Sequence, residues 1–463
     1  LIMSDIPNTS IEYAFIDACS KGHLKLAKTL YQKNPTIDIS AENEKAFRYS
    51  CEKGYLNISK WLYEIKPTIV ISAENDYAFF EACYAGHLVV VKWLYEIKPS
   101  INISIRKDNV FRYACGNGDL ELAKWLYEIN PNIVISAENE ISFRWACKNG
   151  HLEVVKWLYE IKQSICISAK NEYAFRYACG KGHLNIAKWL YEINPSISIS
   201  AENEYAFRFA CSTGHLDVAK WLYEIKPTII ISAENEFAFC RACSNGHLHV
   251  AKWLYEIKPT INIFAENEYA FCLCCFNGHL DIIKWLYGTA QSIGLYFQNK
   301  VSFRFACERG NLYIIKWLYE INPTFYIFDI NEKHFWVACF YGHFDMAKWL
   351  YKINPTIDIS IDNDSVFNWA CLNDNLDILK WLQTLMPYGL YYTFELNQKT
   401  NKILSYSTKK LNYSFLKNRL DIVHPGNEIC FREALVRNRF HPKYIDKWVV
   451  WGHDDPEDFD MLD

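Results

Sequence analysis

Cysteine and histidine are the residues of this chain that could bind a metal or act as a nucleophile, and both recur on one fixed spacing. Cysteine stands at positions 19, 51, 83, 115, 147, 179, 211, 243, 275, 307, 339 and 371, always 32 residues apart. Eight of the thirteen histidines follow a glycine at one point of the same period, where Tyr55, Asp119, Asn311 and Asn375 stand in other copies. A catalytic or metal-binding residue is needed once and does not tolerate such exchanges. We call the residues that recur at one position of the period a ladder. We interpret the cysteine ladder and the histidine ladder as structural, with the histidines forming hydrogen bonds at a helix start.

The remaining cysteines and histidines give no stronger indication of chemistry. Cys272, Cys274 and Cys275 form a cluster, but no second pair or suitably placed histidine accompanies it, so it is a weak indication of zinc. Successive ladder cysteines would lie about 10 Å apart, the helix-packing distance, whereas a disulfide needs Cα atoms within about 7 Å. The sequence contains no phosphate-binding glycine loop, HExxH or GxSxG motif. We expect no enzymatic activity, no catalytic residue, no metal and no cofactor.

Composition excludes several classes of protein. The 463 residues carry 49 Lys and Arg against 53 Asp and Glu, a net charge of −4, which does not call for a nucleic-acid partner. Hydrophobic residues make up 51% of the chain, enough for a large core, but no run of 18 apolar residues would span a membrane. The first residues, LIMSDIPNTS, lack the features of a signal peptide. Many unpaired thiols favour a reducing compartment, so we expect a cytoplasmic protein.

Each 32-residue unit predicts two helices. One copy reads SAENEYAFRFACSTGHLDVAKWLYEIKP, beginning at Ser200. Ser200 is a candidate N-cap for the first helix, which should end at Gly214. His215 opens the second helix, which should end near Pro227 because proline disfavours a helical residue before it. The isoleucine-rich connection at 228–232 alternates as a short extended segment does.

A single helical pair cannot bury all of its apolar side chains, so neighbouring repeats must cover them. Eleven of the 16 tryptophans stand ten residues after a ladder cysteine, in the second helix, and we expect them to pack between repeats rather than form a binding platform. Every copy has a lysine nine residues after the cysteine, and eight copies have a glutamate four residues later, which should neutralise that face. The predicted fold is all-α, a helical-pair solenoid of twelve 32-residue repeats with short extended connections and a C-terminal cap.

The stretch AFRFACSTGHLDVAKWL at 206–222 resembles the core of an ankyrin repeat, a TPLHxAAxxGH stretch followed by a VVxxLL helix. Arg208 takes the place of the motif histidine, and Gly214 and His215 fill its turn. The WLYEI segments are similar to the ankyrin-like families of mimivirus-type giant viruses. The glycine that turns the finger of the family is absent, and SAENE stands in its place. We therefore expect a shorter connection and a lengthened first helix.

The chain is predicted to divide into two parts. Residues 1–387 form the repeat solenoid, and residues 388–463 form a helical C-terminal cap or small docking segment with an acidic tail. Within this second part, 415–423 and 431–449 look like decayed repeat units.

The resemblance implies that the first helices line a concave side, where ankyrin-type proteins bind their partners. Tyrosine, tryptophan and arginine dominate interface energetics, and these types recur two and three residues before the ladder cysteine. The alternative is that the aromatic residues pack between repeats and the arginines pair with the SAENE carboxylates. The candidate partner-binding residues are Tyr49, Arg112, Tyr113, Arg144, Trp145, Arg176, Tyr177, Arg208, Phe209 and Phe305.

The function that we expect is a non-enzymatic protein–protein interaction scaffold. Its partner is a protein of unknown identity, a host protein if the chain is viral, and the chain works as a monomer in the host cytoplasm, without nucleic acid or membrane. The resemblance also suggests an adaptor that brings host targets to ubiquitin ligases. The alternative is a structural virion or inclusion component that assembles through the sides of the solenoid.

Overall fold

The computed structural model describes residues 8–101, 109–292, 300–322, 332–357, 375–385, 392–396 and 403–408, together with residues 103, 359, 366, 370 and 373. Two compact units are distinguished, Leu1–His334 and Phe335–Asp463. The domain boundary predicted at residue 387 stays a prediction, since residues 386–391 lie outside the described ranges.

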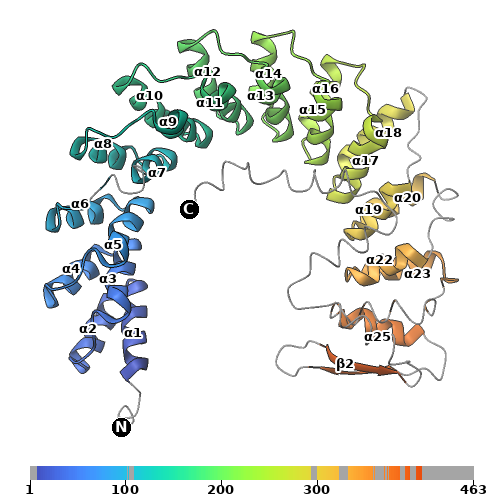
Figure 1. Cartoon of the computed structure of the whole chain (residues 1–463). Helices are drawn as coiled ribbons and strands as arrows, with labels where there is room; N and C mark the ends of the chain where they lie inside the picture. Colours follow the sequence, from blue (N-terminus) through green and yellow to red (C-terminus); the bar gives the residue numbers. More distant parts are fainter. Residues whose placement is uncertain are drawn as a thin grey trace. The chain divides into compact units, whose positions relative to one another are not determined.

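In the described residues, each of the first eleven 32-residue periods folds into a helical pair, and the twelfth is described by its second helix (Figure 1). The first helices of the pairs are α1 (Asn8–Ser20), α3 (Ala41–Glu52), α5 (Ala73–Tyr84), α7 (Asn109–Asn117), α9 (Ala137–Asn149), α11 (Ala169–Gly180), α13 (Ala201–Ser212), α15 (Ala233–Ser244), α17 (Ala265–Asn277), α19 (Lys300–Glu308) and α22 (Glu332–Phe340). The second helices are α2 (Leu24–Lys33), α4 (Leu56–Ile65), α6 (Leu88–Ile97), α8 (Leu120–Ile129), α10 (Leu152–Ile161), α12 (Leu184–Ile193), α14 (Leu216–Ile225), α16 (Leu248–Ile257), α18 (Leu280–Ser292), α20 (Leu312–Ile321), α23 (Phe344–Ile353) and α25 (Leu376–Leu385). From α1 to α19, each first helix packs against the first helix of the next repeat, so these helices form one layer.

The core between repeats is built from the residues that recur. Phe207 is fully buried, and its ring lies 6.2 Å from that of Trp253 in the next repeat. Tyr223 contacts the same indole edge-on, with ring centroids 6.0 Å apart. The predicted packing of the tryptophans between repeats is therefore confirmed.

The helix ends and the connections follow the sequence pattern. Helix α14 ends at Ile225, two residues before Pro227, as predicted. In the connection after it, Ile229 and Ile231 are buried, whereas Ile230 between them is 60% exposed. The alternation predicted for this segment is thus present, although its backbone forms no ladder with another strand in the described residues.

The glycine–histidine turn joins one repeat to the preceding one. Gly214 has a φ of 85°, and a Cβ added there would come within 2.5 Å of Nδ1 of His247 in the next repeat. His183 is hydrogen-bonded through Nε2 to the carbonyl oxygen of Lys148 at 3.0 Å, and Asn311 donates from Nδ2 to that of Phe276 at 2.9 Å. The hydrogen bond predicted at the start of the second helix is thus directed instead to the end of the preceding repeat's first helix, which both histidine and asparagine can reach.

The start of the first helix differs from the prediction of a lengthened helix. Within the described ranges, six repeats have positive φ, between 52° and 65°, at all three residues that stand seven to nine positions before the ladder cysteine. We call each of these segments a left-handed turn; they comprise residues 42–44, 74–76, 138–140, 170–172, 202–204 and 234–236. Ser200 forms no side-chain cap, and its hydroxyl group donates to Glu204 Oε1 at 2.6 Å instead. Both the longer helix and the serine N-cap are therefore wrong, because a different backbone conformation occupies this segment.

The C-terminal segment is also different from the helical prediction where it is described. Strands β1 (Tyr392–Leu396) and β2 (Ile403–Thr408) pair antiparallel, with an irregularity of register between Glu395 and Leu396. Strand pairs of this kind need a β-forming sequence, and YTFEL and ILSYST are rich in β-branched and aromatic residues. The segments 415–423 and 431–449 lie outside the described residues.

Candidate protein-binding surface

The six aromatic residues predicted as partner contacts all lie on first helices, two residues before a ladder cysteine, and all six are partly exposed. The aromatic residues six positions before the cysteine, which the sequence analysis did not include, join them. The aromatic row defined here consists of Tyr173, Tyr177, Tyr205, Phe209 and Phe237.

The rings of the aromatic row form a continuous stack over three repeats. Within a repeat the two rings are nearly parallel, 4.1 Å apart for Tyr173 and Tyr177 and 4.0 Å apart for Tyr205 and Phe209. Between repeats Tyr177 lies 5.4 Å from Tyr205, and Phe209 lies 5.6 Å from Phe237. The recurrence of aromatic residues at this second position was the sequence signal for these members, since four residues separate the two positions and make them neighbours on one helix face.

The four predicted arginine contacts are buried in this layer. Arg112, Arg144, Arg176 and Arg208 are between 3% and 8% exposed. Arg176 donates from Nε to the carbonyl oxygen of Asn171 at 2.6 Å and from Nη2 to that of Lys170 at 3.1 Å.

Arg144 and Arg208 form the same two bonds in their own repeats. Each of these guanidinium groups therefore donates to two backbone carbonyl groups of a left-handed turn. The alternative prediction was that the arginines pair with the SAENE carboxylates, and it did not include these carbonyl bonds. Arg112 is the exception, because its Nη1 lies 2.9 Å from Glu138 Oε1 in the next repeat.

The same guanidinium groups also lie over rings of the aromatic row. Arg144 lies over the ring of Tyr173 at 4.6 Å, Arg176 over Tyr205 at 4.8 Å and Arg208 over Phe237 at 4.9 Å. A guanidinium group over an aromatic face is electrostatically favourable, and more so where it is desolvated. The row is therefore fixed both by its own stacking and by a buried cation in each of three repeats.

Buried glutamates attach the left-handed turns to the rest of the repeat. Glu204 is 3% exposed, and its Oε1 accepts a bond from the backbone N–H of Ile230 at 3.4 Å in addition to that from Ser200. Neighbouring turns are linked as well, because Asn203 donates from Nδ2 to Glu234 Oε1 at 2.7 Å. These bonds hold the turns as one connected edge beside the aromatic row.

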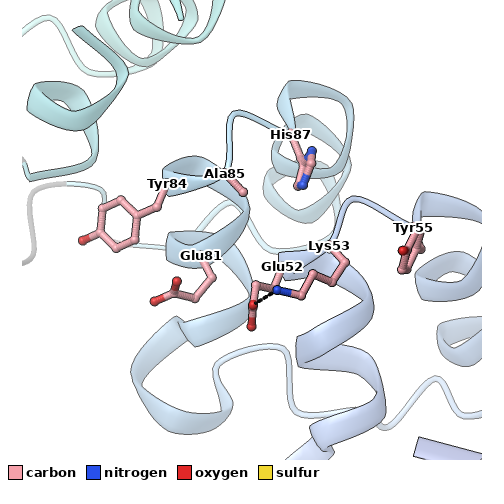
Figure 2. Close-up of a pocket in the computed structure, with 7 residues that line it drawn as sticks. All are labelled: Glu52, Lys53, Tyr55, Glu81, Tyr84, Ala85 and His87. Atoms are coloured by element: carbon pink, nitrogen blue, oxygen red, sulfur yellow. Dashed lines mark hydrogen bonds and ion pairs between the residues drawn. The ribbon is translucent and has the colours of Figure 1, made fainter. Parts of the chain in front are cut away.

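A shallow open hollow lies in the same layer, between α3 and α5 (Figure 2). Lys53 pairs with Glu52 at 2.6 Å, and the hydroxyl group of Tyr77 donates to the other oxygen of that carboxylate at 2.8 Å. The hollow is lined by Glu52, Lys53, Tyr55, Glu81, Tyr84, Ala85 and His87.

The second helices carry the lysine ladder, whose pairing differs from the prediction. Lys124 lies 3.5 Å from Glu121, and Lys156 lies 3.8 Å from Glu153. In both cases the partner is the carboxylate three residues earlier, not the glutamate four residues later, which is consistent with the less favourable order of the latter pair.

The described ranges hold no group of three or more His, Cys, Asp or Glu side chains arranged to bind a metal ion. No helix within them combines the length and the apolar character needed to cross a membrane.

Comparison with known proteins identifies the family of this stack. A model described as ankyrin repeats (3 copies) matches residues 143–233 and 207–295, and one described as ankyrin repeats (many copies) matches residues 79–126 and 335–383. The crystal structure of the human ASB11 ankyrin repeat domain is similar at 16% identity and a TM-score of 0.32, covering 42% of this chain and 95% of that chain. No curated protein matches. Because the two ankyrin-repeat models together match more than half of its residues, the chain belongs to the ankyrin-repeat proteins.

Proposed function

We propose that this protein is a protein-binding scaffold without enzymatic activity, and that its partner docks on the aromatic row and the first-helix layer around it. Ankyrin repeats typically serve as protein–protein interaction scaffolds, which supports the general form of the proposal. The aromatic row supports its location, because large aromatic side chains contribute most of the binding energy at many interfaces.

The observation that carries the location is the continuous ring contact from Tyr177 through Tyr205 to Phe209. All three rings are partly exposed, and each is fixed by its neighbours. A side chain that is already held in one rotamer loses little conformational entropy when a partner binds. The row therefore offers apolar contact area that is organised before binding.

The narrower form of the proposal is a monomeric viral adaptor that binds host proteins through the concave side of the solenoid, in the host cytoplasm. The similarity of the WLYEI segments to giant-virus ankyrin-like families supports this form. Residues 1–387 would then be the partner-binding solenoid, and residues 388–463 a cap or docking segment for a second partner.

The experiment is affinity purification from cells with the full-length chain and with a Tyr177→Ala/Phe209→Ala variant. We expect the wild-type chain to retain a partner at fixed stoichiometry and the double variant to lose at least about tenfold in capture. Tyr313→Ala is the matched control, since Tyr313 is 80% exposed on α20, which is a second helix and not part of the first-helix layer. Circular dichroism and thermal melts establish that each variant remains folded.

Retention of every partner by a folded double variant would contradict the proposed location. Concentration-dependent filaments of the purified chain, with no partner at fixed stoichiometry, would favour the structural virion or inclusion component instead. Deleting residues 388–463 in the same experiment tests whether that segment recruits a partner of its own.

A further inference from the structure

We propose that Asn117 is a site of spontaneous deamidation, which converts its side-chain amide to a carboxylate where the fourth repeat meets the third. Glycine has no side chain to shield its backbone nitrogen, so this nitrogen can attack the side-chain carbonyl carbon of a preceding asparagine. Four repeats have an asparagine directly before the glycine that separates their two helices. These pairs are Asn117–Gly118, Asn149–Gly150, Asn245–Gly246 and Asn277–Gly278.

The reaction at each pair consumes only water. At the first pair, the backbone nitrogen of Gly118 forms a bond to Cγ of Asn117 and gives its proton to the solvent. The bond between Cγ and Nδ2 breaks, and the amide nitrogen leaves as ammonia. Water then adds to one of the two carbonyl carbons of the cyclic imide and opens it. The products are aspartate and isoaspartate, and the isoaspartate adds one methylene group to the main chain.

Hydrogen bonds to the preceding repeat oppose this reaction at three of the four pairs. Nδ2 of Asn149, Asn245 and Asn277 lies between 2.7 and 2.8 Å from a backbone carbonyl oxygen at the end of the preceding repeat's first helix. All three bonds are partly buried. The amide must leave its acceptor before Cγ can turn toward the following nitrogen, so these bonds protect the side chains.

Asn117 forms the longest of the four bonds. Its Nδ2 lies 3.2 Å from the carbonyl oxygen of Tyr84, and this bond is exposed to solvent. Water competes for an exposed hydrogen bond, so its net contribution is small. Asn117 is also the last residue of α7, and helix ends fray. The amide of Asn117 is therefore released more readily than the other three.

Asn149 is the sharpest comparison for Asn117. Both are exposed and stand last in their first helices. Their attacking nitrogens are held alike, because the backbone N–H of Gly118 donates to Cys115 at 3.3 Å and that of Gly150 donates to Cys147 at 3.4 Å. The two pairs therefore differ mainly in the side-chain bond, and a difference in their rates would report on that bond.

A carboxylate at position 117 would weaken the contact between the two repeats. An ionised carboxylate only accepts hydrogen bonds, and here it would face the carbonyl oxygen of Tyr84, which also only accepts. The hydrogen bond between the repeats would thus be replaced by repulsion. This consequence does not depend on the proposed function, because it concerns the packing of the solenoid rather than a partner.

The test is incubation of the full-length chain in mildly alkaline heavy-oxygen water, followed by peptide mass mapping. Hydrolysis of the imide places one labelled oxygen atom in the new carboxyl group, which separates the reaction from changes during later handling. The same incubation in urea gives the rates for the unfolded chain. Asn117→Thr is the control variant, because Thr213 precedes the corresponding glycine in its own repeat and donates from Oγ1 to the carbonyl oxygen of Gly180 at 2.9 Å.

We expect Asn117 of the folded chain to react at least about threefold faster than the other three asparagines. In urea the four should react at similar rates. Thermal melts after incubation should show a loss of stability that the Asn117→Thr variant reduces. Equal rates in the folded chain, the same order of rates in urea, or no reaction at Asn117 while the unfolded chain reacts would each overturn the proposal. A loss of stability that is unchanged in Asn117→Thr would overturn the weakening of the repeat contact.

Discussion

Arg208 donates from Nε to the carbonyl oxygen of Asn203, five residues earlier, at 2.7 Å, and this bond joins a buried side chain to a left-handed backbone. Asn203 has φ 55° and ψ 54°, in the region that costs a residue with a Cβ about 1–2 kcal/mol. Three such residues in succession require compensation. The two carbonyl bonds of Arg208, the bonds of Glu204 and the link from Asn203 to Glu234 provide it.

Replacing Arg208 with lysine should therefore destabilise the repeat although the charge is kept. A lysine ammonium group does not reproduce the planar fork that reaches the carbonyl groups of Glu202 and Asn203. We expect Arg208→Lys to lower the free energy of unfolding by about 1–3 kcal/mol, measured by urea denaturation. Lys220→Arg, at an exposed position of the second helix, serves as the control. An unchanged midpoint for Arg208→Lys would mean that these carbonyl bonds do not support the turn.

Replacing either of two exposed lysines of the same repeat with glycine should have opposite effects on stability. Lys170 has a φ of 54° in a left-handed turn, whereas Lys188 lies inside the right-handed helix α12. Lys170→Gly keeps the carbonyl group that accepts from Arg176 and removes the Cβ strain, so we expect stability to rise by up to about 1 kcal/mol. Lys188→Gly should lower it by about 1 kcal/mol. Thermal melts of the two variants check this, and a similar loss for both would contradict the left-handed assignment.

The helical pairs could be predicted from sequence because their signals are local and repeated. The spacing of Ala206, Phe207 and Cys211 defines one helix face, and Pro227 limits the second helix. The left-handed turn could not be predicted in this way. Glu202 and Glu204 are not residue types that favour positive φ, and the bonds that stabilise them come from a side chain four to six residues away and from a backbone group 26 residues away.

The aromatic residues of the candidate site could be predicted from their recurrence, whereas the burial of its arginines could not. Tyr177 and Phe209 were identified because they recur at one position, and the structure brings them together through Tyr205. Arg176 was included because arginine is one of the residue types that dominate interface energetics. Its burial depends on the carbonyl groups of a turn that the sequence does not reveal. Whether these residues contact a partner stays a prediction.

Trp221 should be among the side chains that contribute most to the interface between two repeats. Its ring lies 6.2 Å from that of Phe175 and 6.0 Å from that of Tyr191, both in the preceding repeat. We expect Trp221→Ala to cost about 3 kcal/mol and Trp221→Phe clearly less. In a solenoid the loss acts first on the adjoining repeats, so hydrogen exchange should accelerate in α11 to α14 before distant helices. Uniform acceleration along the chain would contradict this nearest-neighbour behaviour.

The histidine turns should make stability depend on pH. Burial lowers the pKa values of His183, His215 and His247 below the ordinary value of about 6.5. The unfolded chain therefore binds protons first as pH falls, so stability is full above about 6.5 and decreases below it. Changing all three histidines to asparagine, which Asn311 shows can form the bond to the preceding repeat, should reduce this decrease. Thermal melts at several pH values compare the variants; an equal decrease with and without the histidines would contradict their role.

Alkylation should distinguish the exposed thiol of Cys166 from the buried thiols of the ladder cysteines. Burial raises the pKa values of Cys19 and Cys51 to about 12, and burial raises that of Cys211 as well, so these buried thiols hold almost no thiolate at neutral pH. Cys166 is exposed in the connection between two repeats. We expect iodoacetamide to modify Cys166 in the folded chain and to reach the ladder only in denaturant, as read by peptide mass mapping. Cys166→Ser is the control, and modification of Cys211 at the rate of Cys166 would show that the repeats open readily.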